Sequence, residues 1–224
     1  MSILIKNIHC IKALVNRNPE MVISLKADSK KDSEIIALAE SRNIQIDLTT
    51  NGMSAVCKEP PIKDIKSQGY ELGNMVLIMD EIQDTRNLGS CLRSASFFGV
   101  NSVVIPKNNS ADFSNPAVIE TSTGGIYDLD LYKATNIATL QENLKKNGYW
   151  ISGFSEHAEI SLEETEFTEK NVLILGNEEK GIRKLVEKNC DQVLKINKYG
   201  RTSSLNVAVA TAIALFEVQK KLRY

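Results

Sequence analysis

The segment Tyr199-Gly-Arg-Thr-Ser-Ser-Leu-Asn-Val-Ala-Val-Ala210 joins a glycine turn, two serines and an asparagine to the start of a long helix-forming run. Hydroxyl groups just before a helix accept hydrogen bonds from its first N–H groups, so Ser203 and Ser204 predict a capped helix over Leu205–Leu222. A helix start is electropositive and rich in donors. Asn206 adds an amide that both donates and accepts. The segment therefore indicates either a simple helix cap or a site for a polar ligand.

Short apolar runs alternate with helical patterns through the last two thirds of the chain. The predicted strands are Met75–Met79, Ser102–Ile105, Tyr149–Ile151, Val172–Leu175 and Val193–Ile196, and the predicted helices are Leu88–Phe98, Asn136–Lys146, Ile182–Asn189 and Leu205–Leu222. Continuous Val/Ile/Leu strands separated by helices predict an α/β fold, with a parallel sheet covered by helices on both faces. Ligands of such sheets bind at the carboxyl ends of strands, so polar residues directly after strands are the site candidates.

The first part of the chain has its own, shorter α/β pattern. Met21–Leu25 and Ile44–Leu48 read as strands, and Asp32–Ser41 between them reads as a helix. The following segment Glu59–Gly69 is rich in charge and contains two adjacent prolines. Because paired prolines do not join a helix interior or a central strand, this segment predicts a connection between domains. We therefore expect a small domain over residues 1–70 and a larger one over residues 71–224.

Composition narrows the class of protein. The 224 residues fit one large domain or a large domain with a small one. The 27 Lys and Arg residues balance 28 Asp and Glu residues, which argues against binding nucleic acid through global positive charge and leaves a local basic face open. No apolar run approaches the roughly 20 residues of a membrane span, and Met1–Val15 lacks the features of a signal peptide. We expect no membrane partner.

Cysteine and histidine usage predicts a reducing compartment and no metal centre. The four cysteines are scattered, without a Cys-x-x-Cys pair, which is typical of free thiols in the cytoplasm. The two histidines, His9 and His157, lie far apart in the sequence and read as ordinary surface or packing residues.

The first polar constellation follows the strand that ends at Met79. Asn87 is placed to cap the next helix, and Arg93 lies away from its apolar stripe. That stripe consists of Leu88, Leu92, Ala95 and Phe98. The pattern fits a capped helix with a solvated arginine, and equally an anion or hydroxyl site formed by Asn87 and Arg93.

The second constellation, Leu173-Ile-Leu-Gly-Asn-Glu-Glu-Lys-Gly-Ile182, follows a strand that ends at Gly176. It is not a P-loop, because no Lys-Ser/Thr follows its second glycine, and it lacks the Gly-x-Gly-x-x-Gly dinucleotide fingerprint. Glu178 either complements a helix start or holds a ligand hydroxyl and orients Arg93.

The third constellation is the segment quoted at the outset, with the residues on either side of it. Its loop carries Lys195, Lys198 and Arg201, which fit phosphate contacts or a solvated loop. In the helix, one face is predicted to be core: Leu205, Ala208, Val209, Ala212 and Phe216. A local basic patch is predicted from Arg86, Lys107, Arg183, Lys198 and Arg201.

The three constellations together resemble the SpoU (TrmH-type) branch of the SPOUT RNA methyltransferases. The resemblance rests on Asn87-Leu-Gly-x-x-x-Arg93, on Gly176-x-Glu178-x-x-Gly181 and on Ser204-Leu-Asn-Val-Ala-Val-Ala210, and it covers roughly Gly73 to Tyr224. The start of the chain, with Asn7-Ile-His9 and Ser67-Gln-Gly69, resembles the L30-like substrate-binding domain of bacterial rRNA guanosine 2′-O-methyltransferases.

The resemblance implies a cytoplasmic homodimer that uses S-adenosyl-L-methionine to methylate a ribose 2′-hydroxyl of RNA, here a guanosine of 23S rRNA. It also implies a C-terminal trefoil knot, an RNA rather than a DNA partner, and cofactor contacts at the backbone of Gly176, Ile196 and Leu205. The catalytic groups would be Asn87, Arg93, Glu178, Ser204 and Asn206. A guanidinium stays protonated, so Arg93 would stabilise the developing alkoxide, across the subunit interface if need be.

Two other functions remain open at this point. One is a tRNA ribose methyltransferase of the same family, although such enzymes usually lack this N-terminal domain. The other is a non-catalytic RNA-binding or ribosome-assembly protein with the same fold.

Overall fold

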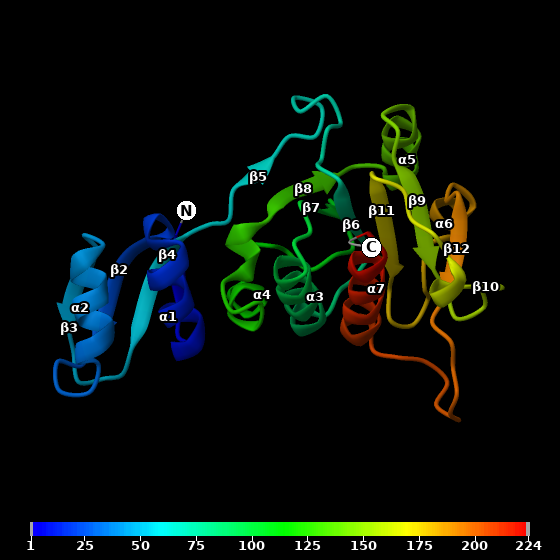
Figure 1. The fold of residues 1–224 in the computed structure, drawn as a ribbon. Helices are drawn as coiled ribbons and strands as arrows, with labels where there is room; N and C mark the ends of the chain where they lie inside the picture. Colours follow the sequence, from blue (N-terminus) through cyan, green and yellow to red (C-terminus); the bar gives the residue numbers. More distant parts are fainter. Residues whose placement is uncertain (1, 223–224) are drawn as a thin grey trace.

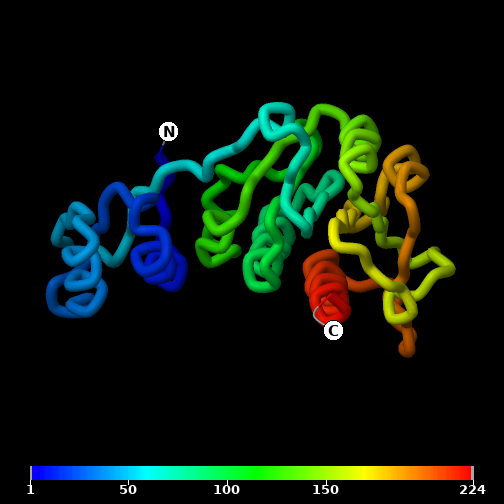
Figure 2. The backbone as a smooth tube through the Cα atoms, turned by 45° about the horizontal axis from the view of Figure 1, so that its top comes forward, coloured from blue at the N-terminus to red at the C-terminus, as the bar shows by residue number. Residues whose placement is uncertain are grey.

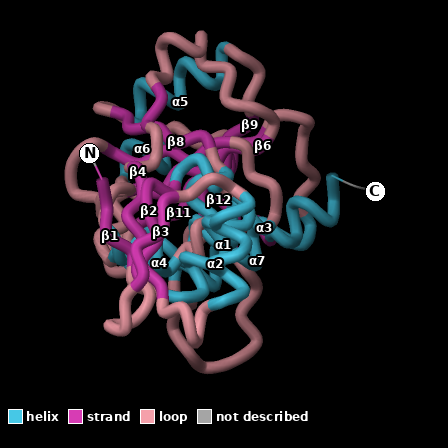
Figure 3. The backbone as a smooth tube through the Cα atoms, turned by 90° about the vertical axis from the view of Figure 1, so that its left-hand side faces the viewer, coloured by secondary structure: helices cyan, strands magenta, loops and turns pink. Residues whose placement is uncertain are grey.

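The computed structural model describes residues 2–222, which form two units, each built on its own sheet (Figure 1). The small unit contains β1 (Ser2–Ile5), α1 (Ile8–Arg17), the 3-10 helix η1 (Pro19–Met21), β2 (Val22–Ala27), α2 (Ser33–Ser41), β3 (Gln45–Leu48) and β4 (Ser54–Lys58). Its strand order is β1-β4-β2-β3, with β2 and β3 parallel and the other pairs antiparallel. Viewed from this end, its strands lie to one side and α1 and α2 to the other (Figure 3).

The large unit is an eight-stranded parallel sheet in the order β10-β12-β9-β11-β6-β7-β8-β5. Its strands are β5 (Ile62–Lys63), β6 (Met75–Asp80), β7 (Ser102–Pro106), β8 (Asp130–Ala134), β9 (Trp150–Phe154), β10 (Ile160–Ser161), β11 (Asn171–Gly176) and β12 (Gln192–Lys195). Its helices are α3 (Thr85–Phe97), α4 (Pro116–Thr121), η2 (Gly125–Asp128), α5 (Ile137–Lys146), η3 (Leu162–Glu164), α6 (Lys184–Lys188) and α7 (Val207–Leu222). The predicted parallel α/β sheet is confirmed.

Successive residues of β6 face opposite sides of the sheet, and helices cover both sides. Every residue of β6 is buried, as expected for a strand with helices on both faces. Met75, Leu77 and Met79 belong to the core cluster that includes α3, α4 and α7, whereas Val76 and Ile78 belong to the cluster with α5 and α6. The odd and even positions therefore face different helical layers.

The two units are packed together rather than joined by a free linker. Glu120 of α4 accepts hydrogen bonds from the backbone N–H groups of Lys6 (2.6 Å) and Asn7 (3.0 Å). Asp128 accepts from Arg17 of α1 (3.2 Å) and from Ser96 of α3 (2.8 Å). One buried apolar cluster continues from the small unit into the large one. Figure 2 shows α1 against the part of the large unit that contains α4.

The predicted strands and helices lie within a few residues of the observed ones, but five strands were not predicted. They are β1, β4, β8 and β10, together with β5 in the segment predicted as a plain connection. This two-residue strand pairs with β8 at the edge of the sheet, directly after the paired prolines. Sheet edges tolerate prolines because no neighbour needs their missing N–H donors.

The predicted core face of the last helix is wrong. Its buried residues are Val207, Thr211, Ala214, Leu215 and Val218, and the helix begins at Val207. Val209 is 47% exposed and Phe216 is 55% exposed. The helix is apolar almost all round, so periodicity alone did not identify the packed face. On α3, by contrast, the predicted stripe is confirmed for Leu88, Leu92 and Ala95.

Within residues 2–222, no helix combines the length and apolar character needed to cross a membrane.

Candidate active site

The predicted site residues lie in three loops at the carboxyl ends of β6, β11 and β12 and in the helix α3 that follows the first of these loops. The first leads into α3, the second (residues 177–183, the β11 loop) leads into α6, and the third (residues 196–206, the β12 loop) leads into α7. The carboxyl end of β11 and the start of α7 lie at the lower edge of the large sheet in Figure 1. Because parallel strands present their carboxyl ends at one edge, the three loops meet there.

Asn87 lies in the first turn of α3 and does not cap it. The cap is Asp84, whose carboxylate accepts hydrogen bonds from the N–H groups of Arg86 and Asn87, both at 2.8 Å. The predicted capping role of Asn87 is therefore wrong. A carboxylate at this position also complements the positive end of the helix. With the cap supplied by Asp84, the Asn87 amide is free to bond across the site.

Glu178 accepts that bond: its Oε1 lies 2.8 Å from Nδ2 of Asn87. The β11 loop that carries Glu178 is a tight hairpin closed by two backbone hydrogen bonds between Asn177 and Gly181. The fold requires glycine at position 176, because a Cβ there would lie 2.1 Å from the carbonyl carbon of Gly181. The turn is so tight that Glu178 is held toward α3.

Asn206 completes a chain of hydrogen bonds. Its Nδ2 donates to Oδ1 of Asn87 (2.9 Å), and its Oδ1 accepts from the N–H of Ala208 (2.8 Å). Asn206 thus caps α7, a role that the sequence assigned to Ser203 and Ser204, and that prediction is wrong. Asn87 therefore bonds to Glu178 through its amide nitrogen and to Asn206 through its oxygen. One residue from each predicted constellation belongs to this Glu178–Asn87–Asn206 chain.

The ion pair between Asp80 and Arg183 anchors the β11 loop to the end of β6. Asp80, at the end of β6, is fully buried, and it accepts hydrogen bonds from the backbone N–H and from the guanidinium of Arg183. The hydrogen bond to Asp80 raises the pKa of Arg183 above its already high ordinary value. Arg183 also lies 3.3 Å from Glu81. Its charge is therefore neutralised within the chain, which argues against its predicted place in an RNA-binding patch.

Asn177 adds a further brace. Its Oδ1 accepts hydrogen bonds from the N–H groups of Glu179 and Lys180, and its Nδ2 donates to the backbone oxygen of Glu81. Sequence reasoning missed Asp80, Arg183 and Asn177 as contributors to the site. A charged residue directly after an apolar strand was the available signal for Asp80.

An open cleft of about 360 Å³ lies beside the Asn87–Glu178 pair. It is lined by Gln83, Asp84, Asn87, Asn177, Glu178, Glu179 and Lys180. The predicted cofactor contacts do not line it: Gly176 and Ile196 are half-buried, and Leu205 is 49% exposed. The backbone groups of residues 197–205 make no hydrogen bond within the described chain, so they are available to a polar ligand.

Arg93 and Ser204 lie apart from the hydrogen-bonded chain. Arg93 follows Asn87 by six residues, which places it about 9 Å further along the helix and about 120° around it. Its Cα lies near Gly125 of η2, and its side chain is exposed. Ser204 is exposed in the β12 loop. In residues 2–222, no hydrogen bond joins either side chain to Asn87, Glu178 or Asn206.

The side chains present limit the chemistry. Burial raises the pKa of the Cys91 thiol to about 12, and the thiol packs against Thr211 between α3 and α7. Burial raises the pKa of Cys57 to about 11 and that of Cys10 and Cys190 to about 12, so none of the four thiols is a ready nucleophile at neutral pH. Among residues 2–222, no cluster of three His, Cys, Asp or Glu side chains is arranged to hold a metal ion. What remains is a set of amide, carboxylate and hydroxyl groups suited to orienting polar ligands.

The model of the SpoU rRNA Methylase family matches residues 74–216, which include all three loops. The chain belongs to the SpoU family. Two relatives, both named 23S rRNA (guanosine-2′-O-)-methyltransferase RlmB, match almost end to end. The one from Pseudomonas syringae pv. tomato is 31% identical over 97% of this chain and 95% of its own. The one from Escherichia coli K12 is 32% identical over 99% of each.

Solved SpoU structures share the fold. AviRb from Streptomyces viridochromogenes, in complex with the cofactor AdoMet, superposes with a TM-score of 0.83 at 20% identity, covering 99% of this chain and 91% of its own. The A. aeolicus TrmH/SpoU tRNA modifying enzyme superposes with a TM-score of 0.60 at 22% identity, covering 71% of this chain and 84% of its own.

Proposed function

We propose that this SpoU protein transfers a methyl group from S-adenosyl-L-methionine to the 2′-hydroxyl of a guanosine in 23S rRNA. The observation that carries the proposal is the Glu178–Asn87–Asn206 hydrogen-bonded chain, which unites three loops at the carboxyl ends of three strands. A ribosomal rather than a tRNA substrate is supported by the extent of the matches. The RlmB relatives match the small unit as well, whereas the tRNA modifying enzyme covers 71% of the chain.

The backbone of the β12 loop fits the proposed cofactor. S-adenosyl-L-methionine supplies an activated methyl group on a sulfonium. The uncommitted N–H and C=O groups of residues 197–205 can bond its polar groups, together with the backbone at Gly176, Ile196 and Leu205. Gly176 lets the backbone of Gly181 and Ile182 pack directly against the end of β11, which fixes the backbone edge beside the proposed cofactor site.

The polar side chains are proposed to align and activate the ribose. Methyl transfer needs the 2′-oxygen in line with the methyl group and needs its proton removed. Asn87, fixed by Glu178 and Asn206, presents a rigid amide edge to the ligand. Ser204 supplies a hydroxyl that no other residue in the described chain binds. Arg93 stabilises the developing alkoxide with its fixed positive charge.

We propose that the active protein is a homodimer in which Arg93 acts on the partner's ribose. Two features support this. Arg93 lies far around α3 from Asn87 in the same chain. In addition, Phe97 is 81% exposed, while Val209 and Phe216 on α7 are about half exposed, so apolar area remains uncovered on the two helices that flank the site.

We further propose that residues 1–70 form an L30-like RNA-binding domain and residues 71–224 form the methyltransferase domain. Strand β5 belongs to the first range but pairs with the large sheet.

A C-terminal trefoil knot is proposed as well. Its support is Lys221 of α7, whose Nζ donates to the backbone oxygens of Leu162 (3.1 Å), Glu163 (2.6 Å) and Thr165 (2.7 Å) in the segment between β9 and β11. A ribosomal RNA substrate makes the cytoplasm the proposed location.

The test is methyl transfer to in vitro transcribed 23S rRNA, followed by mapping of 2′-O-methylated positions. We expect one guanosine to be modified by the wild-type protein and the rate to fall by at least about a hundredfold in Arg93→Ala, in line with the loss of one charge-stabilising donor. An undiminished rate would contradict the role of Arg93. Transfer to tRNA but not to rRNA would favour the tRNA alternative, and calorimetry without uptake of S-adenosyl-L-methionine would favour a pure RNA-binding protein.

A further inference from the structure

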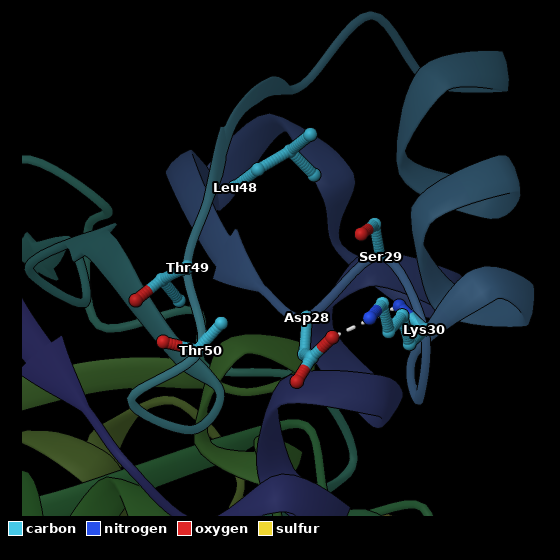
Figure 4. A pocket seen from close by; sticks show the side chains of 6 residues that line it. All are labelled: Asp28, Ser29, Lys30, Leu48, Thr49 and Thr50. Carbon is cyan, nitrogen blue, oxygen red and sulfur yellow. Dashed lines mark hydrogen bonds between the residues drawn. The ribbon is translucent and has the colours of Figure 1, made fainter.

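The small unit has an open cleft of its own, with a volume of about 440 Å³ (Figure 4). It lies at the carboxyl ends of the parallel strands β2 and β3, and is lined by Asp28, Ser29, Lys30, Leu48, Thr49 and Thr50. This is the position at which parallel sheets bind ligands, and none of the residues of the methyl-transfer site contributes to it.

Asp28 is the most informative residue of this cleft. It is only 8% exposed, yet its side chain points into the cleft (Figure 4). Its Oδ1 accepts a hydrogen bond from the N–H of Lys30 at 2.9 Å, whereas its Oδ2 accepts none from residues 2–222. A carboxylate only accepts hydrogen bonds, so a complementary ligand has to offer donors at this point.

The other side chains of the cleft match the remaining parts of a nucleotide. Ser29, Thr49 and Thr50 line the cleft with hydroxyl-bearing side chains, a type that can bond to sugar and phosphate oxygens, and Lys30 carries a positive charge that can pair with a phosphate. Leu48 is 67% exposed and offers an apolar surface against which a base can pack. The combination of acceptor, hydroxyls, cation and apolar surface therefore fits one nucleotide of a single-stranded RNA segment.

The Asp28 carboxylate only accepts hydrogen bonds, so it favours bases that present donors. Guanine presents two neighbouring donors, N1–H and N2–H, on its Watson–Crick edge. Adenine and cytosine present one amino group beside an acceptor nitrogen, which a carboxylate oxygen would repel, and uracil presents a single N–H between two acceptors. Single-stranded RNA exposes these edges for reading by protein side chains. Guanine is the base that fits Asp28 best.

The cleft is also held in a fixed relation to the methyl-transfer site. The loops after β2 and β3 and the start of α7 all lie along the lower edge of the molecule in Figure 1. The contacts of Glu120 with Lys6 and Asn7, and of Asp128 with Arg17, lock the small unit in this orientation. An RNA that contacts both places would run along this edge.

We propose that the cleft around Asp28 binds an unpaired guanine of the RNA substrate, at a nucleotide other than the methylated one. The proposal rests on the proposed function, since it takes RNA as the substrate. Under this proposal, the small unit recognises one particular base of the RNA, in addition to contacting the RNA backbone.

The test compares Asp28→Asn with Asp47→Asn, using in vitro transcribed 23S rRNA. Both changes remove one negative charge from the small unit, but Asp47 lies on β3 outside the cleft and is exposed. General electrostatics predicts equal or tighter RNA binding for both variants, because a charge that repels phosphates is lost. The cleft proposal predicts that the KM for RNA rises about tenfold in Asp28→Asn and stays unchanged in Asp47→Asn. A tenfold change is the scale expected for the loss of one paired base contact. The kcat should be unchanged in both variants. Asparagine keeps the acceptor for the Lys30 N–H, so the turn is preserved.

Kethoxal footprinting supplies a second readout, because this reagent attacks N1 and N2 of unpaired guanines. We expect a guanine away from the methylated nucleotide to be protected by the wild-type protein and by Asp47→Asn, but exposed with Asp28→Asn and with Thr50→Val. Identical footprints and KM values for all four proteins would overturn the proposal while leaving methyl transfer intact. Absence of methyl transfer by the wild-type protein would instead contradict the proposed function. Urea unfolding of each variant checks that the fold is retained.

Discussion

The β11 loop and the β12 loop border the same site but are held in opposite ways. The β11 loop is fixed by the buried Asp80–Arg183 pair, by the Asn177 side chain and by a backbone hairpin. In the β12 loop, the backbone of residues 197–205 makes no hydrogen bond within the described chain. The β12 loop is held through side chains instead: Asn197 donates to Ser161 (2.9 Å) and Glu163 (3.1 Å), and Asn206 donates to Asn87 (2.9 Å). The backbone of the β11 loop is thus committed to the protein, whereas the backbone of the β12 loop is available to a ligand. Committed groups suit alignment of the reacting atoms, and uncommitted backbone groups suit binding of a cofactor that must enter and leave.

The largest expected effect comes from breaking the brace of the β11 loop. Arg183→Ala keeps the backbone N–H that Asp80 accepts but leaves this buried carboxylate without its charged partner. We therefore expect the free energy of unfolding to fall by about 3–5 kcal/mol, and methyl transfer to be lost. Urea unfolding followed by circular dichroism measures the change. Arg201→Ala in the β12 loop is the matched control, and its stability should change by less than about 0.5 kcal/mol. Equal stabilities for the two variants would show that the two loops are not held differently.

Two glycine substitutions, one at the end of β11 and one in the β12 loop, test whether the backbone is packed more tightly in the first region than in the second. Gly176→Ala places a Cβ against Gly181, so the loop must shift at a cost of about 1–3 kcal/mol. Gly200→Ala meets nothing within 4 Å and has no positive φ to oppose it, so its stability should stay within about 0.5 kcal/mol of the wild type. Thermal unfolding and a methyl-transfer assay measure both variants. A destabilisation of Gly200→Ala as large as that of Gly176→Ala would contradict the openness of the β12 loop.

Two polar residues of the β12 loop sharpen the comparison further. Asn206→Ala removes the cap of α7 and the bond to Asn87, and should cost about 1 kcal/mol of stability together with activity. Ser204→Ala removes a hydroxyl without a protein partner, so it should lower kcat while the unfolding free energy stays within about 0.5 kcal/mol. A Ser204→Ala protein with full kcat would remove Ser204 from the proposed site.

The smallest effect concerns salt. If Lys198 and Arg201 contact RNA phosphates, replacing each by glutamine lowers the slope of log K against log salt concentration by about one. Filter binding with 23S rRNA at several salt concentrations measures the slope. Lys146→Gln, on α5 away from the loop, serves as the control and should leave the slope unchanged. Unchanged slopes in the loop variants would place the RNA contacts elsewhere.

The sequence predicted the parallel sheet correctly because long apolar runs such as the one ending at Met79 carry a strong signal. The site was predicted in part, since Asn87, Glu178 and Asn206 do meet. Their pairing partners were not foreseeable: whether Asp84 or Asn87 caps α3 depends on backbone angles that residue types leave undecided. The buried face of α7 was mispredicted because a helix that is apolar all round gives periodicity no contrast.

Lys221 has a consequence for the order in which the protein folds. It contacts the backbone of Glu163, although the two residues are 58 positions apart in the sequence. Asn206 bonds to Asn87 across a separation of 119 residues. Contacts between such distant residues form only after the entropy of closing a long loop has been overcome. No single segment can therefore assemble the site by local folding, and the site is complete only when the whole large sheet has formed.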